Sequence, residues 1–175
     1  MTGEDQLILL AEISIALAGF AGIVVTYQFR DTHKISRGNA VGLALIIHCG
    51  LVDGFFAVLP MAVFFLGVSE QSAFRFSSAM HCVNYALYYA WTIRNMRGVP
   101  VRNQGAKVYF LALYALGVGV FVINVLNALN IHFHGEFGPY FLACLLPLMI
   151  AGYMFARLVL RPLWRALREA ETDAT

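Results

Sequence analysis

The sequence predicts an all-α polytopic membrane protein with five transmembrane helices, its N terminus outside and its C terminus in the cytoplasm. Of the 175 residues, 60% are hydrophobic and 13% are charged, and the mean hydropathy is +0.71. A water-soluble domain of this length needs more polar residues to cover its surface. The excess apolar surface is therefore expected to face lipid. The apolar residues gather in five long runs, and nearly all basic residues lie on one side of them.

Each predicted span is a run long enough to cross a bilayer, which takes about 20 mostly apolar residues in a helix. The five runs are 6–28, 41–67, 73–93, 107–130 and 139–160. The third run is the least hydrophobic, because it contains Arg75, His81 and Asn84, but without it the connectors would not alternate sides. None of the runs has the period-two alternation of a membrane β-barrel. The chain is expected to be a single transmembrane domain with a basic cytoplasmic tail, 161–175, and no soluble domain.

The distribution of Lys and Arg predicts the orientation. Eleven of the twelve basic residues lie in three segments, 28–40, 94–107 and 157–168. Only Arg75 lies on the opposite side. Cytoplasmic loops are enriched in Lys and Arg, which predicts an integral protein of a plasma membrane or bacterial inner membrane with its N terminus outside. Acidic residues such as Glu4 precede the first run, so it is expected to be a retained helix and not a signal peptide.

Aromatic residues mark the expected membrane boundaries. Tyr27, Trp91 and Trp164 lie near the inner ends of the first, third and fifth runs, where aromatic rings anchor helices at the interface. The basic, amphipathic segment 157–171 is expected either to lie on the inner leaflet against anionic lipid or to be a solvated helix end. The connectors are too short for a nucleotide-binding or catalytic module, and no nucleic-acid partner is expected.

Glu12 is the first candidate functional residue, and it lies in the outer half of the first run. At helical spacing it shares a face with Ala16, Gly19, Ile23 and Thr26. Small residues on a helix face permit close approach of another helix, so Glu12 is expected to point toward protein or water and not toward lipid. It is either an ion-binding or relay carboxylate, or a protonated group hydrogen-bonded to a neighbouring helix.

Asp53 is the second candidate, and it falls near the middle of the second run. A charged group at this depth is costly unless it has a partner. Gly50 and Gly54 flank it at the GxxxG spacing that permits close helix packing. Pro60 has no N–H, so the carbonyl of Phe56 loses its usual helical donor, and a kink or an inserted water is expected. Asp53 is interpreted as a cation-binding or relay group, against a purely structural role.

Four neutral residues are candidates for lining a pathway, namely His81, Asn84, Asn124 and Asn127. Helix arithmetic places most of the polar groups in the outer half of the membrane, with Asp53 near its middle. This pattern predicts an outward-facing aqueous vestibule that ends at Asp53. The alternative is that these side chains only lock helices together through hydrogen bonds.

Two pairs of histidines raise the question of a cofactor. His48 and His81 could be axial ligands to a haem between helices, but by residue count they lie on opposite sides of the membrane midplane. His132 and His134, with Glu136 nearby, form an external HxH pattern that could bind a transition metal. The alternative for these three residues is an ordinary exposed turn. No cofactor is predicted, although a bound cation fits the carboxylates.

Three classes of function fit these residues. The first is a small channel or transporter-like protein that passes cations or protons, with Glu12 and Asp53 as binding or relay groups, because carboxylates concentrate cations. Five helices leave little room for an enclosed pore, so this class implies a homo-oligomer. The second class is a structural, sensor or assembly subunit of a membrane complex. The third is a haem-bearing or other redox protein. An enzyme is disfavoured, because motifs such as HExxH and the P-loop are missing.

Overall fold

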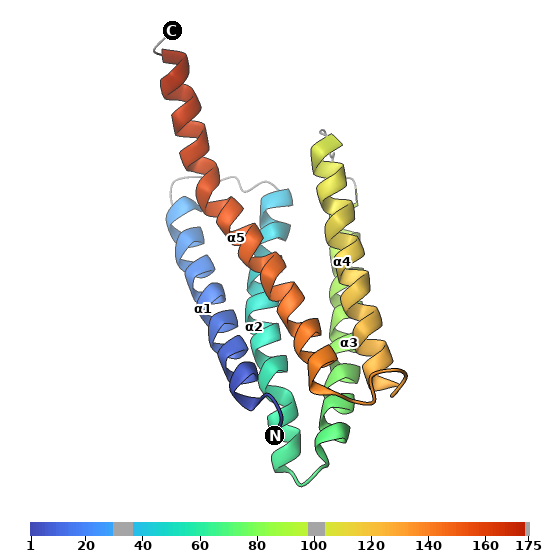
Figure 1. Cartoon of the computed structure of the whole chain (residues 1–175). Helices are drawn as coiled ribbons and strands as arrows, with labels where there is room; N and C mark the ends of the chain where they lie inside the picture. The colour runs from blue at the N-terminus through green and yellow to red at the C-terminus, as the bar shows by residue number, and fades with distance from the viewer. Residues whose placement is uncertain (30–36, 98–103, 174–175) are drawn as a thin grey trace.

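The chain folds into an up-and-down bundle of long helices (Figure 1). The computed structural model describes residues 1–29, 37–97 and 104–173, and its regular structure there is entirely α-helical. The helices of this described part are α1 (Glu4–Phe29), α2 (Arg37–Phe65), α3 (Glu70–Met96), α4 (Gln104–Ala128) and α5 (Phe137–Asp173). Successive helices are antiparallel, so the N terminus and the turns 66–69 and 129–136 lie at one end, here called the N-terminal end. The helical C-terminal segment lies at the other, the C-terminal end.

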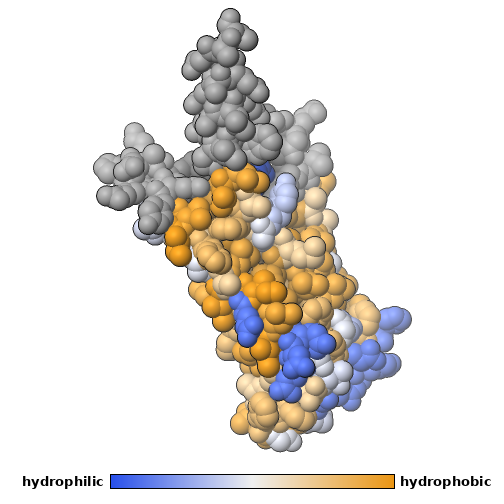
Figure 2. Space-filling view, turned by 60° about the vertical axis from the view of Figure 1, so that its left-hand side comes forward, coloured by the Kyte–Doolittle hydropathy of each residue, from blue (hydrophilic) through white to orange (hydrophobic). Residues whose placement is uncertain are grey.

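Length and composition confirm a multi-pass membrane protein. In the described residues, four segments are apolar and long enough to cross a membrane, namely Glu4–Thr26, Gly42–Phe65, Leu111–Ala128 and Phe137–Leu160. Large apolar side chains such as Phe20, Phe55 and Leu111 are exposed. In Figure 2 the middle of the visible face is mainly hydrophobic, and hydrophilic residues gather near the N-terminal end. The third predicted run is helical as α3, but it is not among the four apolar segments.

Several predictions about the basic end fall on parts of the chain that are not described. Arg30, Lys34 and Arg102 lie outside the described residues. The backbone of α5 continues as a helix beyond Leu160 to Asp173, but the side chains of the basic tail, including Trp164, are also outside the described set. Contact of this tail with anionic lipid therefore stays a prediction.

The central helices of the bundle are α2 and α5. α2 packs on α1, α3 and α5, while α5 also packs on α1 and α4. α3 and α4 pack on each other. Among the described residues, α1 touches only α2 and α5, so it lies at the edge and keeps one side free of intrachain neighbours.

The close contact between α1 and α2 depends on the two glycines predicted to permit packing. A Cβ atom placed on Gly50 would lie 2.7 Å from the Cβ of Ala18 and 2.8 Å from the carbonyl oxygen of Ser14. A Cβ on Gly54 would lie 3.3 Å from Cγ1 of Ile15. Without these side chains the two backbones can approach closely. The GxxxG pattern is thus confirmed as a packing device, and its partner is α1.

A tyrosine side chain fills the gap that Pro60 leaves in α2. Pro60 cannot donate to the carbonyl of Phe56, and the hydroxyl of Tyr140 on α5 donates to that carbonyl instead. Tyr140 is fully buried. The free carbonyl was expected to produce a kink or to bind a water, whereas it binds a side chain from another helix. The prediction of a missing helical donor is confirmed, and the bond ties α2 to α5.

Replacing Tyr140 by phenylalanine should lower the free energy of unfolding by about 1–3 kcal/mol, because a buried carbonyl loses its donor. The measurement is denaturant or thermal unfolding of the purified protein in detergent. Pro60→Ala provides the control, since alanine restores a backbone N–H for Phe56. In a double-mutant cycle, Tyr140→Phe should cost much less in the Pro60→Ala background. Equal losses in both backgrounds would show that the hydroxyl of Tyr140 stabilises something else.

Arg75, the one basic residue outside the three basic segments, makes a local structural contact. Its Nε donates to the carbonyl of Ala128, the last residue of α4, at 3.2 Å. The last carbonyls of a helix have no helical donor, and a basic side chain both satisfies them and complements the helix dipole. The single basic residue at the N-terminal end therefore has a local structural role.

Candidate functional site

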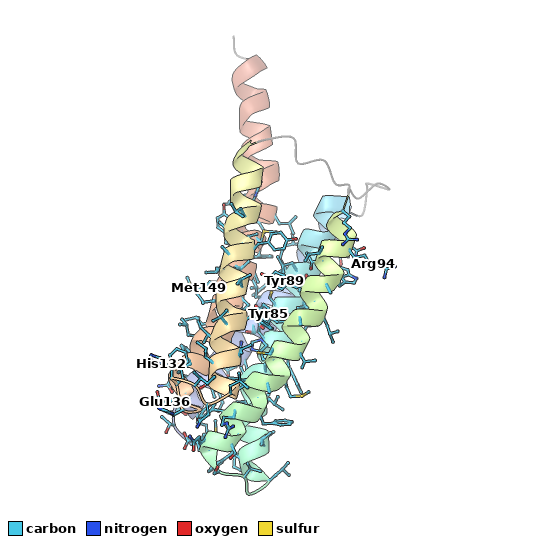
Figure 3. The ribbon with its side chains drawn as sticks, turned by 90° about the vertical axis from the view of Figure 1, so that its right-hand side faces the viewer. Tyr85, Tyr89, Arg94, His132, Glu136 and Met149 are labelled. Carbon is cyan, nitrogen blue, oxygen red and sulfur yellow. The ribbon has the colours of Figure 1, made fainter. Side chains whose placement is uncertain are left out.

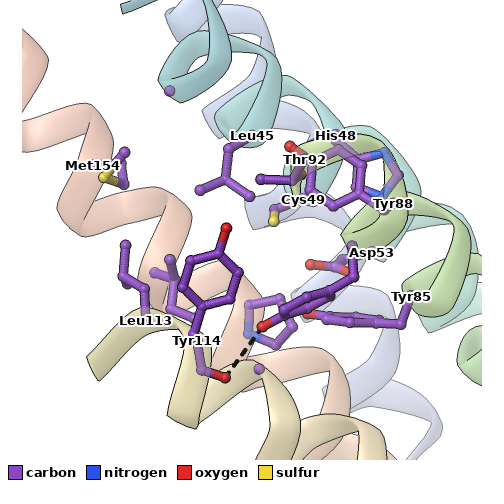
Figure 4. Close-up of a pocket in the computed structure, with 15 residues that line it drawn as sticks. Leu45, His48, Cys49, Asp53, Tyr85, Tyr88, Thr92, Leu113, Tyr114 and Met154 are labelled. Carbon is purple, nitrogen blue, oxygen red and sulfur yellow. Dashed lines mark hydrogen bonds between the residues drawn. The ribbon is translucent and has the colours of Figure 1, made fainter. Parts of the chain in front are cut away.

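Four helices enclose a cavity of about 110 Å³ (Figure 4). Its polar lining residues are His48, Cys49, Asp53, Tyr85, Tyr88, Tyr89, Thr92 and Tyr114. They come from α2, α3 and α4, while α5 adds apolar residues such as Met154, and α1 adds none of its described side chains. One water needs about 10–15 Å³ of such volume, so the cavity can hold several waters or a small molecule.

The cavity lies between Asp53 and the C-terminal end of the bundle. α2 and α4 start at that end, and they contribute residues from their first halves, such as Gly42 and Leu113. α3 ends there and contributes Thr92 from its last turns. Asp53, near the middle of α2, is the lining residue of α2 farthest from the C-terminal end.

Aromatic rings form much of the wall. Tyr85, Tyr88 and Tyr89 come from successive turns of α3 and Tyr114 comes from α4. The ring of His48 stacks on Tyr88 with centroids 3.8 Å apart. The hydroxyl of Tyr89 donates to the carbonyl of Tyr114 at 3.4 Å. These contacts hold two of the rings in place at the edge of the cavity.

A glycine on α4 makes space for one of these rings. A Cβ on Gly117 would overlap the hydroxyl of Tyr89. Gly117 is therefore needed for the position of that hydroxyl. Neither this glycine nor the role of Tyr89 and Tyr114 was found from the sequence. The available signal was the spacing of Tyr85, Tyr88 and Tyr89, which places them on one face of a helix.

Asp53 is only 2% exposed and lies at the floor of the cavity. Its Oδ1 is 3.4 Å from Nε2 of His81. The geometry does not make a hydrogen bond, and among the described residues neither Nε2 of His81 nor Oδ2 of Asp53 has a hydrogen-bond partner. Buried polar atoms without partners are rare and usually contact a water, an ion or a proton-carrying group. Asp53 and His81 therefore form an incompletely satisfied pair.

The neighbours of His81 indicate where its proton lies. Nδ2 of Asn124 donates to the carbonyl of Val120 at 3.2 Å, which fixes the orientation of this amide. The same nitrogen lies 3.4 Å from Nδ1 of His81, and Sγ of Cys144 lies 4.0 Å from Nδ1. Both neighbours can donate, which favours the tautomer with an N–H at Nε2, the ring nitrogen that faces Asp53.

The other predicted pathway residues pack instead of lining a vestibule. Asn127 donates to the hydroxyl of Ser78 at 2.9 Å and accepts from the backbone N–H of Glu136 at 3.1 Å. Nδ2 of Asn84 lies 3.4 Å from Nε2 of His48. His81, Asn124 and Asn127 are fully or almost fully buried. They fill the N-terminal side of Asp53, so the cavity lies on the side opposite to the predicted vestibule.

Glu12 is not close to this site. It is exposed on the outer side of α1, together with the other residues predicted to share its face, Ala16, Gly19, Ile23 and Thr26. α1 turns a neighbouring stripe toward α2, with Ala11, Ser14 and Ala18 buried. Within one chain Glu12 therefore faces the surroundings and not another helix. The structure does not bring the two candidate carboxylates together.

The HxH turn lies at the N-terminal end, away from Tyr85 and Tyr89 (Figure 3). His132 and His134 both have a positive φ, 71° and 51°, and the carbonyl of His134 accepts from the side-chain amide of Gln71 at 2.6 Å. Within the described residues, no group of three or more His, Cys, Asp or Glu residues could hold a metal ion. His132, His134 and Glu136 are not brought into such a group.

No family model, no curated protein and no solved structure matches this chain. The chemistry of the site must therefore be inferred from its own residues. A buried carboxylate with one unpartnered oxygen can accept a proton or bind a cation. The adjacent imidazole can stabilise the ionised carboxylate through an N–H at Nε2.

Proposed function

We propose that this protein is a small homo-oligomeric membrane transporter that passes protons or small cations, with Asp53 and His81 as the binding and relay pair. The observation that carries the proposal is the position of Asp53 at the floor of a cavity inside the bundle, together with its buried Oδ2, which has no hydrogen-bond partner among the described residues. An ionisable group at membrane depth marks a functional site more often than a structural one. Flux through reconstituted membranes is the test.

The arrangement favours a carrier over an open channel. The cavity reaches Asp53 from the C-terminal end, while Asn124 and Asn127 pack on the opposite side. With the basic C-terminal end in the cytoplasm, Asp53 would take up a proton or cation from the inside. Release on the other side would then require the α3–α4 packing to open.

A structural or assembly subunit is the second candidate. It is favoured by the hydrogen bonds that Asn127 makes across α3 and α4 to Ser78 and Glu136, since such amides commonly hold membrane helices together. This candidate gives no role to the cavity or to the unpartnered oxygen of Asp53. The transport proposal accounts for both features.

The proposed topology has five spans, including the more polar α3, with the N terminus outside. Single cysteines at the exposed positions Leu66 and Ile131 should react with an impermeant thiol reagent in intact cells. Cysteines at Asn39 and Asn103 should react only after permeabilisation. The background has its native cysteines, Cys49, Cys82 and Cys144, replaced by alanine. Labelling of Asn103→Cys in intact cells would contradict a spanning α3.

The proposed homo-oligomer uses the exposed face of α1. This face carries Glu12 with Gly19 and Gly22, and a Cβ on either glycine would meet nothing within 4 Å. A carboxyl group facing lipid is costly, so contact with another subunit would remove that cost. Native mass spectrometry in mild detergent should show an oligomer, and Gly19→Leu should weaken it. A population consisting only of the 19.4 kDa chain would contradict this proposal.

A further inference from the structure

We propose that the cavity between α2, α3, α4 and α5 binds a small organic ammonium ion, with Asp53 as its counter-ion and the tyrosine rings as its cage. This inference rests on the proposed function and specifies its substrate class. The site is formed by groups from several helices, and Asp53 is the only acidic residue among the described lining residues.

Among the described residues, no lysine or arginine lines the cavity. Nε2 of His81 lies 3.4 Å from Oδ1 of Asp53 without making a hydrogen bond. The described wall therefore offers no lysine or arginine to balance the ionised carboxylate. Oδ2 of Asp53 is buried and has no hydrogen-bond partner among the described residues. A ligand that brings a positive charge and an N–H or N–CH₃ group would complete the site.

The cavity wall carries several tyrosine rings. Tyr85 and Tyr114 (Figure 4) line the same space as Tyr89. The ring of Tyr88 instead stacks on His48 and on Trp91. The face of an aromatic ring attracts cations, and such cages recognise ammonium groups with organic substituents. The remaining wall is largely aliphatic, with Leu45, Leu113, Ile150 and Met154 among its residues. Alkyl groups on the nitrogen would contact these side chains.

A bare metal cation fits this cavity less well than an organic ammonium ion. Hard cations such as Mg²⁺ and Ca²⁺ need about six or more oxygen ligands, and potassium filters replace the hydration shell with rings of carbonyl oxygens. This cavity offers one carboxylate and a few hydroxyls, among them that of Thr92. An alkylammonium ion is less strongly hydrated and gains contact with rings and methyl groups. The volume of about 110 Å³ limits it to a small ion without a long chain.

The test is calorimetric titration of the purified protein in detergent with tetramethylammonium, methylammonium and potassium chlorides. At least one of the two organic ions should bind, while potassium should neither bind nor compete. Asp53→Asn should weaken binding on the order of a hundredfold, since it removes a buried counter-charge. Tyr114→Leu should weaken it about threefold to thirtyfold, the range expected for loss of one cation–π contact. Tyr114→Phe keeps the ring and should bind nearly as well as wild type.

Matched controls separate the cavity from general effects. Glu12→Gln removes a carboxylate outside the cavity, and Tyr153→Leu removes a tyrosine that does not line it. Both should bind like wild type. Asp53→Glu keeps the charge and should retain more affinity than Asp53→Asn, which guards against a variant that merely folds badly. Elution volume and thermal unfolding of each variant are checked in parallel.

The outcomes distinguish this inference from the transport proposal. No binding of either organic ion, equal binding of potassium, or full binding by Asp53→Asn would overturn the ammonium site. Proton or potassium flux in liposomes could still occur in each of those cases, and the transport proposal would then survive alone. Ammonium binding that depends on Asp53 and Tyr114, without any flux, would uphold the site and overturn transport.

Discussion

Liposomes containing the wild-type protein should pass protons or small cations faster than empty liposomes, and Asp53→Asn should reduce that flux on the order of a hundredfold. The amide has nearly the size of the carboxyl group and can keep an oxygen beside Nε2 of His81. It cannot carry a charge or exchange a proton in the cavity. Loss of an essential buried charge commonly costs a factor of this size in binding. The measurement is flux of a pH-sensitive or cation-sensitive dye across the vesicle membrane.

Glu12→Gln is the matched control for this experiment. It makes the same chemical change at an exposed position on α1, a helix whose described side chains do not line the cavity. Its flux should stay near the wild-type value, provided that the oligomer survives. Wild-type vesicles that pass no more protons or cations than empty ones would sink the transport proposal and leave the assembly-subunit role. Normal flux in Asp53→Asn would keep a transporter but remove Asp53 from its mechanism.

The helices themselves could be predicted from the sequence, because long apolar runs report helix length directly. The predicted first run, 6–28, became Glu4–Phe29, and the last, 139–160, became the start of a longer helix ending at Asp173. The third run was correctly assigned as a helix. Its membrane crossing stays a proposal, since polar residues such as Arg75 and His81 keep α3 out of the apolar set.

Asp53 could be singled out from the sequence because a carboxyl group in the middle of a long apolar run is unusual and needs a partner. The carbonyl of Phe56 could also be predicted to lack its helical donor, since a proline such as Pro60 has no N–H to donate. The identity of the new donor, Tyr140, was not predictable. It depends on which helix packs against α2, and hydrophobic runs do not carry that information.

The direction of side chains explains the predictions that differ from the structure. Depth along a helix follows from counting, but rotation about its axis depends on which of two adjacent stripes meets the neighbour. On α1 the stripe of Ala11 and Ala18 faces α2, so Glu12 faces outward. On α4 the amides of Asn124 and Asn127 contact other polar groups and fill space, whereas Gly117 leaves room for the hydroxyl of Tyr89. The cavity consequently lies on the other side of Asp53 from the predicted vestibule.

The second large effect is expected where α1 docks on α2. Gly50→Leu should prevent this docking and unfold or strongly destabilise the bundle, and Gly50→Ala should lower the free energy of unfolding by about 1–3 kcal/mol. A Cβ at this position would approach the Cβ of Ala18 and the carbonyl oxygen of Ser14 to less than 3.0 Å. Both belong to the body of a helix and cannot rotate away. Alanine's intrinsic helix preference over glycine, about 1 kcal/mol, offsets only part of this loss.

Gly119→Ala on α4 is the matched control, because a Cβ there would meet nothing within 4 Å. That substitution should leave stability unchanged or raise it by up to about 1 kcal/mol, since only the helix preference changes. Thermal unfolding in detergent compares the two alanine variants directly. Because α1 touches only α2 and α5 among the described residues, its loss should expose the side of α2 that carries Gly50 and Gly54. Equal stability of Gly50→Ala and Gly119→Ala would show that α1 and α2 are not in the close contact described.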